Sequence, residues 1–545
     1  MKAFLATRVS QWFATSPLRH PRFRLFYFGS IGTALGYTMQ TTVAAWVMAT
    51  LTPSELMVAL VQTASTAPAL LFGLVAGALA DIVDRRRLIL ATQWLLLAST
   101  AILGLATLAG FVGPGMLLAL TFLVGAGLSL YLPAQAASIH DLVSREDLPR
   151  AVALGAVAFN VARAVGPALA GGIAAWIGTG SAFVASSLCF ILMIVPVHRM
   201  KKHERGLPGV PETVFSGVLS GLRFARHSLA MRSLMIRNIG FSLCASAFWA
   251  LLPVIARDQL QLGAGGFGLL SAGFGTGAIV GALAIPGQLR RRSLNAVVLS
   301  GTILWIGAIA LMASSDLVAL AILAACAGGA AWVTVLASLS AGTQSSAPAW
   351  VRARAVSVNL VTGQASLALG SALWGAVASA FGTRIALASS AVAMLLLLVI
   401  TRRAQVAMGE EADVTPGAQL PELAIAVEPR PDDGPVLIQL QYRIDLEHRE
   451  EFLRAIHAVE PARRRNGASS WRVFRDLGED GLFVERFIIA SWAEYVRLRA
   501  RATMADRSLQ DRIEKLQRAD APVRVSRLIG IDRELGVLAS DTPPG

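Results

Sequence analysis

The chain has 545 residues, of which 55% are hydrophobic and only 15% are charged, and its mean hydropathy is +0.60. Soluble domains carry about 25% charged residues, so one large soluble core could not cover this much apolar surface. Uncharged runs such as residues 88–112 are long enough to cross a bilayer as helices. The sequence therefore predicts an all-α polytopic membrane protein.

The charge is unevenly distributed along the chain. Residues 1–401 hold 26 Lys and Arg against 10 Asp and Glu, whereas residues 402–545 hold 22 against 24. The basic residues of the first part lie in short connections between apolar runs and form no single soluble face, which disfavours nucleic-acid binding. Positive connections stay in the cytoplasm. We therefore expect a multi-pass protein of the cell (inner) membrane with both termini in the cytoplasm.

We expect roughly twelve spans from the lengths of the apolar runs. They cover residues 24–50, 54–80, 88–110, 115–138, 149–176, 180–198, 234–257, 266–289, 294–313, 317–341, 352–379 and 383–401. Basic connections alternate with connections that lack Lys and Arg, with Arg257 and Arg384 as the two exceptions. The expected parts are two six-helix bundles, 1–198 and 234–401, joined by a cytoplasmic loop, 199–233.

The two bundles are related by a constant offset of 204 residues. This offset pairs "GALA" at 77–80 with "GALA" at 281–284, and it also pairs glycines in several other spans. The pairs are Gly73 and Gly277, Gly125 and Gly329, Gly166 and Gly370, Gly171 and Gly375, and Gly178 and Gly382. Six spans is an even number, so the repeats run parallel, as in two-bundle secondary transporters with a substrate site between the bundles.

The segment "GALADIVDRRRL" (77–88) resembles the loop signature of the major facilitator superfamily. The stretch "YLPAQAASIHDLVSREDLPRAVALGAVAFNVARAVGPALAGG" (131–172) resembles, more narrowly, the exporters that include the enterobactin exporter and the transmembrane secretion effector group. The likeness covers about residues 20–400. It implies alternating access, a cytoplasmic gate at this loop and export of a small molecule such as a siderophore.

The residues after 401 predict a separate domain. Residues 402–435 are rich in Pro, Glu and Asp and read as a linker. Strands are expected at 436–444, 469–477, 482–492 and 523–531, with helices at 446–465 and 493–518. This β-α-β-β-α-β order predicts a ferredoxin-like α+β domain over 436–532. It resembles the antibiotic-biosynthesis-monooxygenase-like domains, which are often dimeric and so imply self-association.

The loop signature supplies the gating candidates. These are Gly77, Asp81, Asp84, Arg85 and Arg86. A carboxylate at a helix end can pair with arginines or cap a neighbouring helix, and such contacts can differ between gate states. The alternative is that the arginines have no gating role and only fix the membrane topology. The second copy, "GALAIPGQLRRR", has Ile285 in place of Asp81, so we expect a one-sided latch.

Arg163 is the cavity candidate at greatest depth. It lies about 14 residues, roughly 20 Å, into its span, where a charge is costly unless it is paired or hydrated. Its repeat mate is Leu367, and Asn160 shares its helix face. It attracts an anion in or beside the cavity, acts as a switch between helices, or is satisfied by carbonyl groups at a helix break. We expect that break at Gly166 and Pro167, followed by close packing at Gly171 and Gly172.

Four polar side chains at membrane depth complete the cavity candidates: Gln40, Tyr131, Gln135 and Gln364. None of the ten acids in residues 1–401 falls in mid-membrane by these boundaries. Proton coupling, which commonly uses a buried carboxylate, is thus a family expectation that no residue at this depth supports.

The leading interpretation is a secondary active exporter of a small organic molecule, and not an enzyme. The alternatives are a membrane-tethered enzyme and a ligand sensor, both acting through the C-terminal domain, where His448, His457, Trp471, Glu485 and Trp492 are candidates by residue type. No phosphate-binding loop motif indicates a primary pump. Cys189, Cys244 and Cys326 lie in apolar segments, so no disulfide, metal or other cofactor is expected. We expect no removable signal peptide.

Overall fold

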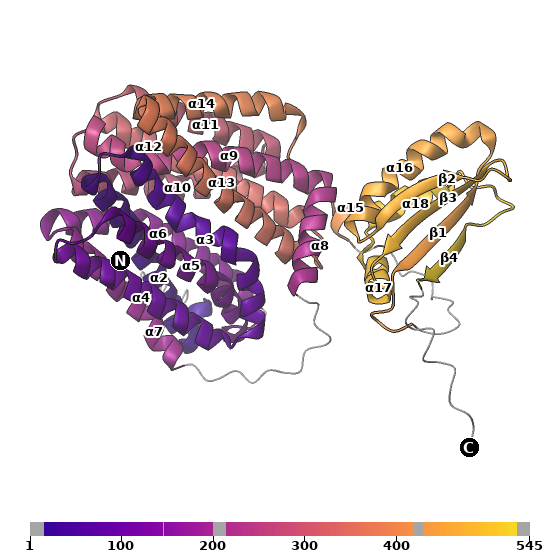
Figure 1. Ribbon diagram of the computed structural model, residues 1–545, viewed down its shortest axis with the longest axis horizontal. Coiled ribbons are helices and arrows are strands. Elements are labelled where there is room, and N and C mark those ends of the chain that lie inside the picture. The colour runs from indigo at the N-terminus through magenta and orange to yellow at the C-terminus, as the bar shows by residue number, and fades with distance from the viewer. Residues whose placement is uncertain (1–15, 145, 200–213, 416, 418–428, 531–545) are drawn as a thin grey trace, which may run out of the picture. The chain divides into compact units, whose positions relative to one another are not determined.

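A computed structural model describes residues 16–144, 146–199, 214–415, 417 and 429–530. The chain forms two compact units. Unit 1 comprises residues 1–214, 235–340 and 359–406, and its described residues are helical apart from short connections. Unit 2 comprises residues 215–234, 341–358 and 407–545, and it contains the C-terminal sheet (Figure 1).

Long helices fill the region of both predicted bundles. The first half, as we name the helices before the central connection, consists of α2 (Pro21–Leu51), α3 (Glu55–Ile82), α4 (Arg85–Leu108), α5 (Pro114–Leu142), α6 (Leu148–Trp176) and α7 (Thr179–His198). The second half consists of α9 (Leu229–Val254), α10 (Ala264–Leu289), α11 (Leu294–Ser314), α12 (Val318–Ser346), α13 (Arg352–Phe381) and α14 (Thr383–Ile400). Short π and 3-10 turns, Ile255–Gln259 and Thr401–Arg403, extend α9 and α14.

Among the described residues, eleven helices are long and apolar enough to cross a membrane. The expected span 24–50 lies within α2, which has 31 residues but is not one of these eleven. Many small polar residues, such as Thr33, Thr38 and Thr42, are buried along α2. They lower its hydropathy while they pack against neighbouring helices. A twelfth crossing by α2 therefore stays a prediction.

The duplication is visible in equivalent close contacts. A Cβ built on Gly125 of α5 would lie 2.5 Å from the carbonyl oxygen of Ser65 on α3. A Cβ on its repeat mate, Gly329 of α12, would collide with the carbonyl oxygen of Phe274 on α10. Glycine at both positions lets the equivalent helix pairs approach closely. Gly178 and Gly382 likewise both precede a helix with positive φ, at 103° and 89°.

The central connection is more ordered than we expected. The loop predicted over 199–233 contains α8 (Val214–His227), and α9 begins at Leu229, before the predicted start at 234. Phe224 and Ala225 of α8 are buried, whereas Leu219 and Leu222 are exposed. The apolar spacing on one face of α8 is that of an amphipathic helix. Residues 200–213 lie outside the described residues.

The C-terminal part of unit 2 has one antiparallel sheet. Its strands are β1 (Val436–Arg443), β2 (Ser469–Arg475), β3 (Leu482–Ile489) and β4 (Arg524–Ile529), in the order β2-β3-β1-β4. β1 alternates buried and half-buried residues, as expected for a strand with one face on a core. That core also includes Phe452 and Ile456 from α16 (Arg449–Arg465).

The helix predicted over 493–518 is wrong as a single element. The structure has two helices there, α17 (Trp492–Arg501) and α18 (Met504–Glu514). Thr503 and Asp506 form a capping box at the start of α18, in which each side chain accepts from the other residue's backbone N–H. A capping box starts a new helix because it satisfies otherwise unpaired N–H groups. The predicted linker also contains a short helix, α15 (Glu411–Val414).

Candidate functional site

The loop between α3 and α4 holds α4 against a neighbouring helix. The Asp84 carboxylate accepts a hydrogen bond of 2.9 Å from the backbone N–H of Arg86 and caps α4. The Arg85 guanidinium donates to Asp141 at 2.8 Å and to the carbonyl oxygen of Ala137 at 3.2 Å, both on α5. The first turn of α4 is thereby fixed to the last turns of α5.

A second guanidinium from the same loop reaches another helix end. Arg86 donates to the carbonyl oxygens of Val197 and His198 at the end of α7. Cations near a helix C-terminus stabilise its unpaired carbonyl groups. The other two gating candidates, Gly77 and Asp81, lie in the last turns of α3, where the side chains are outside the described residues.

Another ion pair lies in the connection before α6. Asp147 accepts from the Arg19 guanidinium at 2.8 Å and lies 3.1 Å from the Nε2 atom of His20. The hydrogen bond with His20 and the charge of Arg19 hold the pKa of this carboxyl below its ordinary value. We call the helix ends beside these charged connections the basic end, and the helix ends beside residues 52–54, 109–113, 177–178, 255–263, 315–317 and 382 the opposite end.

The two halves meet closely at the opposite end. Gly171 of α6 and Gly268 of α10 touch through their backbones, and Trp46 of α2 stacks on Phe267 of α10 with ring centroids 5.7 Å apart. On other helices, Thr383 donates to the Glu55 carboxylate at 2.7 Å. These contacts close the halves against each other at this end.

The two arginines that departed from the charge pattern are both paired. Arg257 forms a salt bridge of 2.6 Å with Asp258 and donates to the carbonyl oxygens of Ala49 and Thr52, in the first half. Arg384 forms a salt bridge with Asp316. Both arginines therefore have acidic partners, but they remain exceptions to the charge pattern from which the topology is predicted.

The predicted break in the fifth span is wrong, because α6 continues from Leu148 to Trp176 with Pro167 inside it. Membrane helices tolerate an internal proline where neighbouring groups form hydrogen bonds with the backbone groups that the proline leaves unpaired. Pro167 leaves the carbonyl of Arg163 without its helical partner, and Thr38 of α2 donates to the neighbouring carbonyl oxygen of Ala162 at 3.0 Å. A Cβ on Gly166 would collide with the Thr38 hydroxyl, whereas one on Gly172 would meet nothing within 4 Å. The motif therefore allows close helix contacts.

Arg163 is half-buried in α6, and its guanidinium carbon lies 5.2 Å from the centre of the Phe159 ring. A cation over an aromatic face is attracted by the electron-rich face of the ring. No carboxylate pairs with Arg163 among the described residues. Asn160 also lies on α6, and it too has an interaction partner.

The remaining cavity candidates lie in different surroundings. Gln40 is fully buried and donates to Thr121 at 3.4 Å between α2 and α5. Tyr131 is buried in a cluster with Phe26 and Ile89. Gln135 of α5 and Gln364 of α13 are half-buried. Among the described residues, no hydrogen bond or ring contact joins any of these four to Arg163.

Sequence reasoning missed two groups in the second half. Asn238 of α9 donates to the side chain and the backbone carbonyl of Asn359 on α13, both at 2.9 Å. Six aromatic residues of α9 to α12 also pack together in edge-to-face and tilted pairs: Phe241, Phe248, Trp249, Phe274, Trp305 and Trp332. The spacing of Phe241 and Phe248 in one span was the available signal, but their partners come from other helices.

The C-terminal candidates contribute to a buried polar network. Glu485 is fully buried, and it accepts hydrogen bonds from Tyr442 at 3.0 Å, Trp471 at 2.8 Å and Arg463 at 3.0 Å. Burial and the neighbouring Glu485 charge raise the pKa of the Tyr442 hydroxyl. The network satisfies both carboxylate oxygens, which favours a structural role.

The other three C-terminal candidates lie around this core. The rings of His457 and Trp471 are 5.6 Å apart, Trp492 packs on Tyr495, and His448 lies beside Glu447. Among the described residues, no group of three or more His, Cys, Asp or Glu could hold a metal.

Within unit 2, α17 contacts membrane-helix ends. The Arg501 guanidinium carbon lies 4.3 Å from the centre of the Trp350 ring, in the α12–α13 connection, and Arg501 also pairs with Glu494 at 2.7 Å. Glu494 lies 3.8 Å from Arg223 on α8. Burial raises the pKa of Glu494, but the charges and hydrogen bonds of Arg501 and Arg497 outweigh it and lower the pKa overall.

The family model of the transmembrane secretion effectors matches residues 12–535. The chain belongs to this family of major facilitator transporters. The match runs past the last membrane helix into the C-terminal sheet, so the transmembrane secretion effector family itself includes residues of the C-terminal part. The monooxygenase-like resemblance of that part stays a prediction.

Curated relatives are transporters. The chain is 26% identical over 273 residues to the staphyloferrin A transporter of Staphylococcus aureus, covering 49% of this chain and 67% of the relative. It is 24% identical over 387 residues to the multidrug efflux pump Tap of Mycolicibacterium fortuitum, covering 69% and 94%.

Solved structures share the fold. A POT family transporter in complex with 5-aminolevulinic acid gives a TM-score of 0.58 at 13% identity, over 70% of this chain and 96% of that one. A bacterial homologue of the human lysosomal transporter Spinster, inward-facing and occupied, gives 0.56 at 15% identity, over 72% and 97%.

Proposed function

We propose that this transmembrane secretion effector exports a small organic molecule by alternating access. The siderophore transporter and the multidrug efflux pump among its relatives support a medium-sized cargo of siderophore, secondary-metabolite or drug-like type. The observation that carries the mechanism is the close packing of the halves at the opposite end, through Gly171 and Gly268 and through Trp46 and Phe267. A carrier that alternates must open these contacts to release cargo on that side.

Cross-linking tests this mechanism. In a variant with the native cysteines replaced, Trp46→Cys and Phe267→Cys are joined by a bifunctional thiol reagent that spans the two helices. We expect export of ethidium from cells to cease in the cross-linked protein and to recover when a cleavable linker is cut. A matched pair within the first half, Leu108→Cys and Gly180→Cys, which lie in contact, should leave export intact. Cross-linked protein that exports at the uncross-linked rate would refute alternating access through these contacts.

The cargo itself is found by comparing the metabolites that accumulate inside cells with and without the protein. The compound that accumulates is then supplied to everted membrane vesicles that contain the full chain. We expect the vesicles to take it up when they are energised. Uptake that survives a proton ionophore would argue against proton coupling. This coupling has little support from the described residues, because the carboxylates on unit 1, such as Glu55, Asp84 and Asp141, lie at helix ends.

A second function, regulation by the C-terminal domain, is favoured by its contacts. Its sheet order, β2-β3-β1-β4, and helices α16 to α18 are those expected for a ferredoxin-like domain. Arg501 and Glu494 contact Trp350 and Arg223, at the α12–α13 connection and on α8. Movement of these segments during transport would have to disturb such contacts, so ligand binding or self-association in this domain could bias the gate.

The membrane-tethered enzyme is the weaker alternative, because the hydrogen bonds of Glu485 leave it no oxygen for a substrate. Deleting residues 405–545 tests whether the C-terminal domain regulates transport or takes part in it. A regulatory domain predicts export that persists but no longer responds to its ligand. Complete loss of export at normal membrane abundance would instead make the domain part of the transport mechanism.

A further inference from the structure

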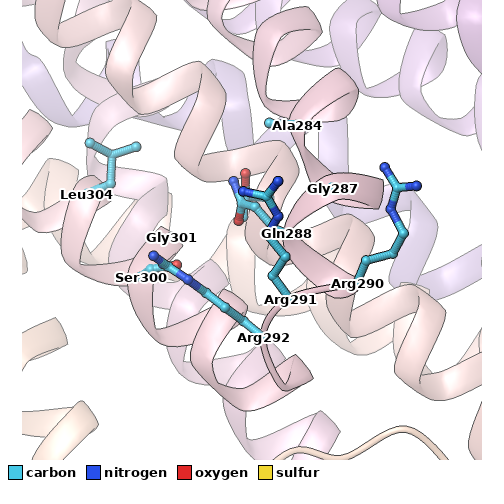
Figure 2. Close-up of a pocket in the computed structure, with 10 residues that line it drawn as sticks. Ala284, Gly287, Gln288, Arg290, Arg291, Arg292, Ser300, Gly301 and Leu304 are labelled. Atoms are coloured by element: carbon cyan, nitrogen blue, oxygen red, sulfur yellow. The ribbon is translucent and has the colours of Figure 1, made fainter.

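The second copy of the loop motif borders a pocket. Helix α10 ends at Leu289, Arg290, Arg291 and Arg292 follow, and the Ser293 side chain caps α11. A pocket of about 900 Å³ opens here, and its lining includes all three arginines. In Figure 2 the side chain of Arg292 runs toward Ser300 on α11, and that of Arg291 runs toward Gln288. Buried Thr334 of α12 also contributes to the lining.

The two copies use their arginines differently. In the first copy, Arg85 pairs with Asp141, and Arg86 donates to carbonyl oxygens at the end of α7. In the second copy, none of the three guanidinium groups forms an ion pair or side-chain hydrogen bond with another described residue, and the pocket lining contains no Asp or Glu. Each guanidinium offers five donors and always carries its charge. Among the described residues, the second copy therefore has no counterpart of the carboxylate that pairs with an arginine in the first copy.

Apolar surface adjoins the arginines. Leu283 of α10 is 77% exposed, and Ile303 and Leu304 of α11 are 56% and 45% exposed. Exposed apolar side chains on the outer faces of membrane helices contact acyl chains. The pocket thus combines a cationic rim at a helix end with an apolar flank toward the middle of the helices. An amphiphile with an anionic head and hydrocarbon tails matches both parts.

We propose that this pocket binds the head group of an anionic phospholipid from the cytoplasmic leaflet. Basic residues at the ends of membrane helices attract anionic lipids. Phosphate esters also match the forked donors of arginine. The inference rests on the membrane placement of the proposed function, but it requires nothing of the cargo.

Lipid binding to the full-length protein tests the proposal without a transport assay. Protein in detergent is titrated with phosphatidylglycerol, with phosphatidylcholine or with inorganic phosphate, and bound lipid is counted by native mass spectrometry. We expect retention of phosphatidylglycerol and little retention of phosphatidylcholine. In the double variant Arg291→Gln with Arg292→Gln, we expect the affinity to fall roughly thirtyfold, because two arginine contacts to the anionic head group are lost.

The control removes the same charge elsewhere on the basic end. Arg402 and Arg403, which follow α14, are exposed and do not line the pocket. Arg402→Gln with Arg403→Gln should retain the lipid. Arg291→Lys with Arg292→Lys keeps the topological charge and should weaken binding less than the Gln pair does. Equal lipid loss in the Arg402 and Arg403 control, unchanged lipid retention in the Arg291 and Arg292 Gln variant, or full displacement by inorganic phosphate would overturn the lipid assignment. Export measured separately distinguishes such a failure from failure of the proposed function.

Discussion

Gly171 of α6 and Gly268 of α10 approach so closely that a Cβ on Gly171 would lie 2.7 Å from the Cα of Gly268. The residues belong to different halves of the transporter. Close glycine contacts let membrane helices approach through van der Waals packing. Under the alternating access that we propose, this contact forms only when the halves are closed at the opposite end, so it would distinguish one conformation from the other.

The first prediction concerns this contact. Gly171→Ala places a methyl group against backbone atoms that cannot move aside, and overpacking of this kind costs about 1–3 kcal/mol. That corresponds to a shift of roughly 5- to 150-fold away from the closed arrangement. We expect thiol labelling of Phe267→Cys from outside the cell to increase accordingly. Gly172→Ala, which would meet nothing within 4 Å, should leave labelling unchanged. Equal labelling in both variants would contradict the prediction.

The second prediction concerns the cap of α4. Asp84→Ala removes the side chain that accepts from Arg86 N–H, and loss of such a cap costs about 0.5–2 kcal/mol. We expect a lower melting temperature and weaker export. Asp84→Asn keeps a capping oxygen and should behave nearly as the wild type. The comparison separates a cap from a charge latch, since a latch would fail in both variants.

The third prediction concerns Asp81, the carboxylate that the second copy replaces by Ile285. Asp81→Asn keeps size and polarity but removes the charge. If Asp81 latches the gate, one state loses a charge-assisted contact of roughly 1.5–3 kcal/mol, which shifts the ratio of states roughly ten- to a hundredfold. Export should fall while expression and substrate binding persist. Ile285→Ala removes no charge and is the matched control. Unchanged export and unchanged accessibility on both faces would leave the motif with a topological role only.

The fourth prediction concerns pH and Glu494. Because its pKa lies below the ordinary 4.5 in the folded protein, the ionised carboxylate stabilises the contacts above that ordinary value. This stabilisation is lost as the pH falls through the lowered pKa. Glu494→Gln should therefore speed hydrogen exchange in residues 219–227 of α8 at pH 7 and remove the acid dependence. Glu479→Gln, which breaks a more exposed pair with Arg443, should have little effect. If hydrogen exchange in α8 stays acid-sensitive in Glu494→Gln, that sensitivity belongs to another titrating group.

The fifth prediction concerns topology. The positive connections predict that the C-terminal domain lies in the cytoplasm. With an impermeant thiol reagent, Asp432→Cys should be labelled only after cells are permeabilised. Leu317→Cys, in the connection before α12 and 65% exposed, should be labelled from outside intact cells. Labelling of position 432 from outside would reverse the predicted orientation.

The sequence by itself determined the membrane class, most of the long helices near their observed bounds and the duplicated plan. It could do so because these depend on local hydropathy, on charge in short connections and on a repeat visible as a fixed offset. The helix starting at Arg85 and the strand starting at Val436 are examples, since each follows from residues within one segment. The prediction of a helix break at Pro167 was wrong, since α6 continues through this residue.

Only the tertiary structure decided the partners of the candidate residues. Arg85 meets Asp141 across 56 residues, and Arg86 meets His198 across 112, whereas Arg290, Arg291 and Arg292 line a pocket. The two copies look alike in sequence because the same basic triplet ends both. Which guanidinium finds a carboxylate depends on how distant helices pack against each other, and hydropathy and charge spacing within one segment carry no information about that packing.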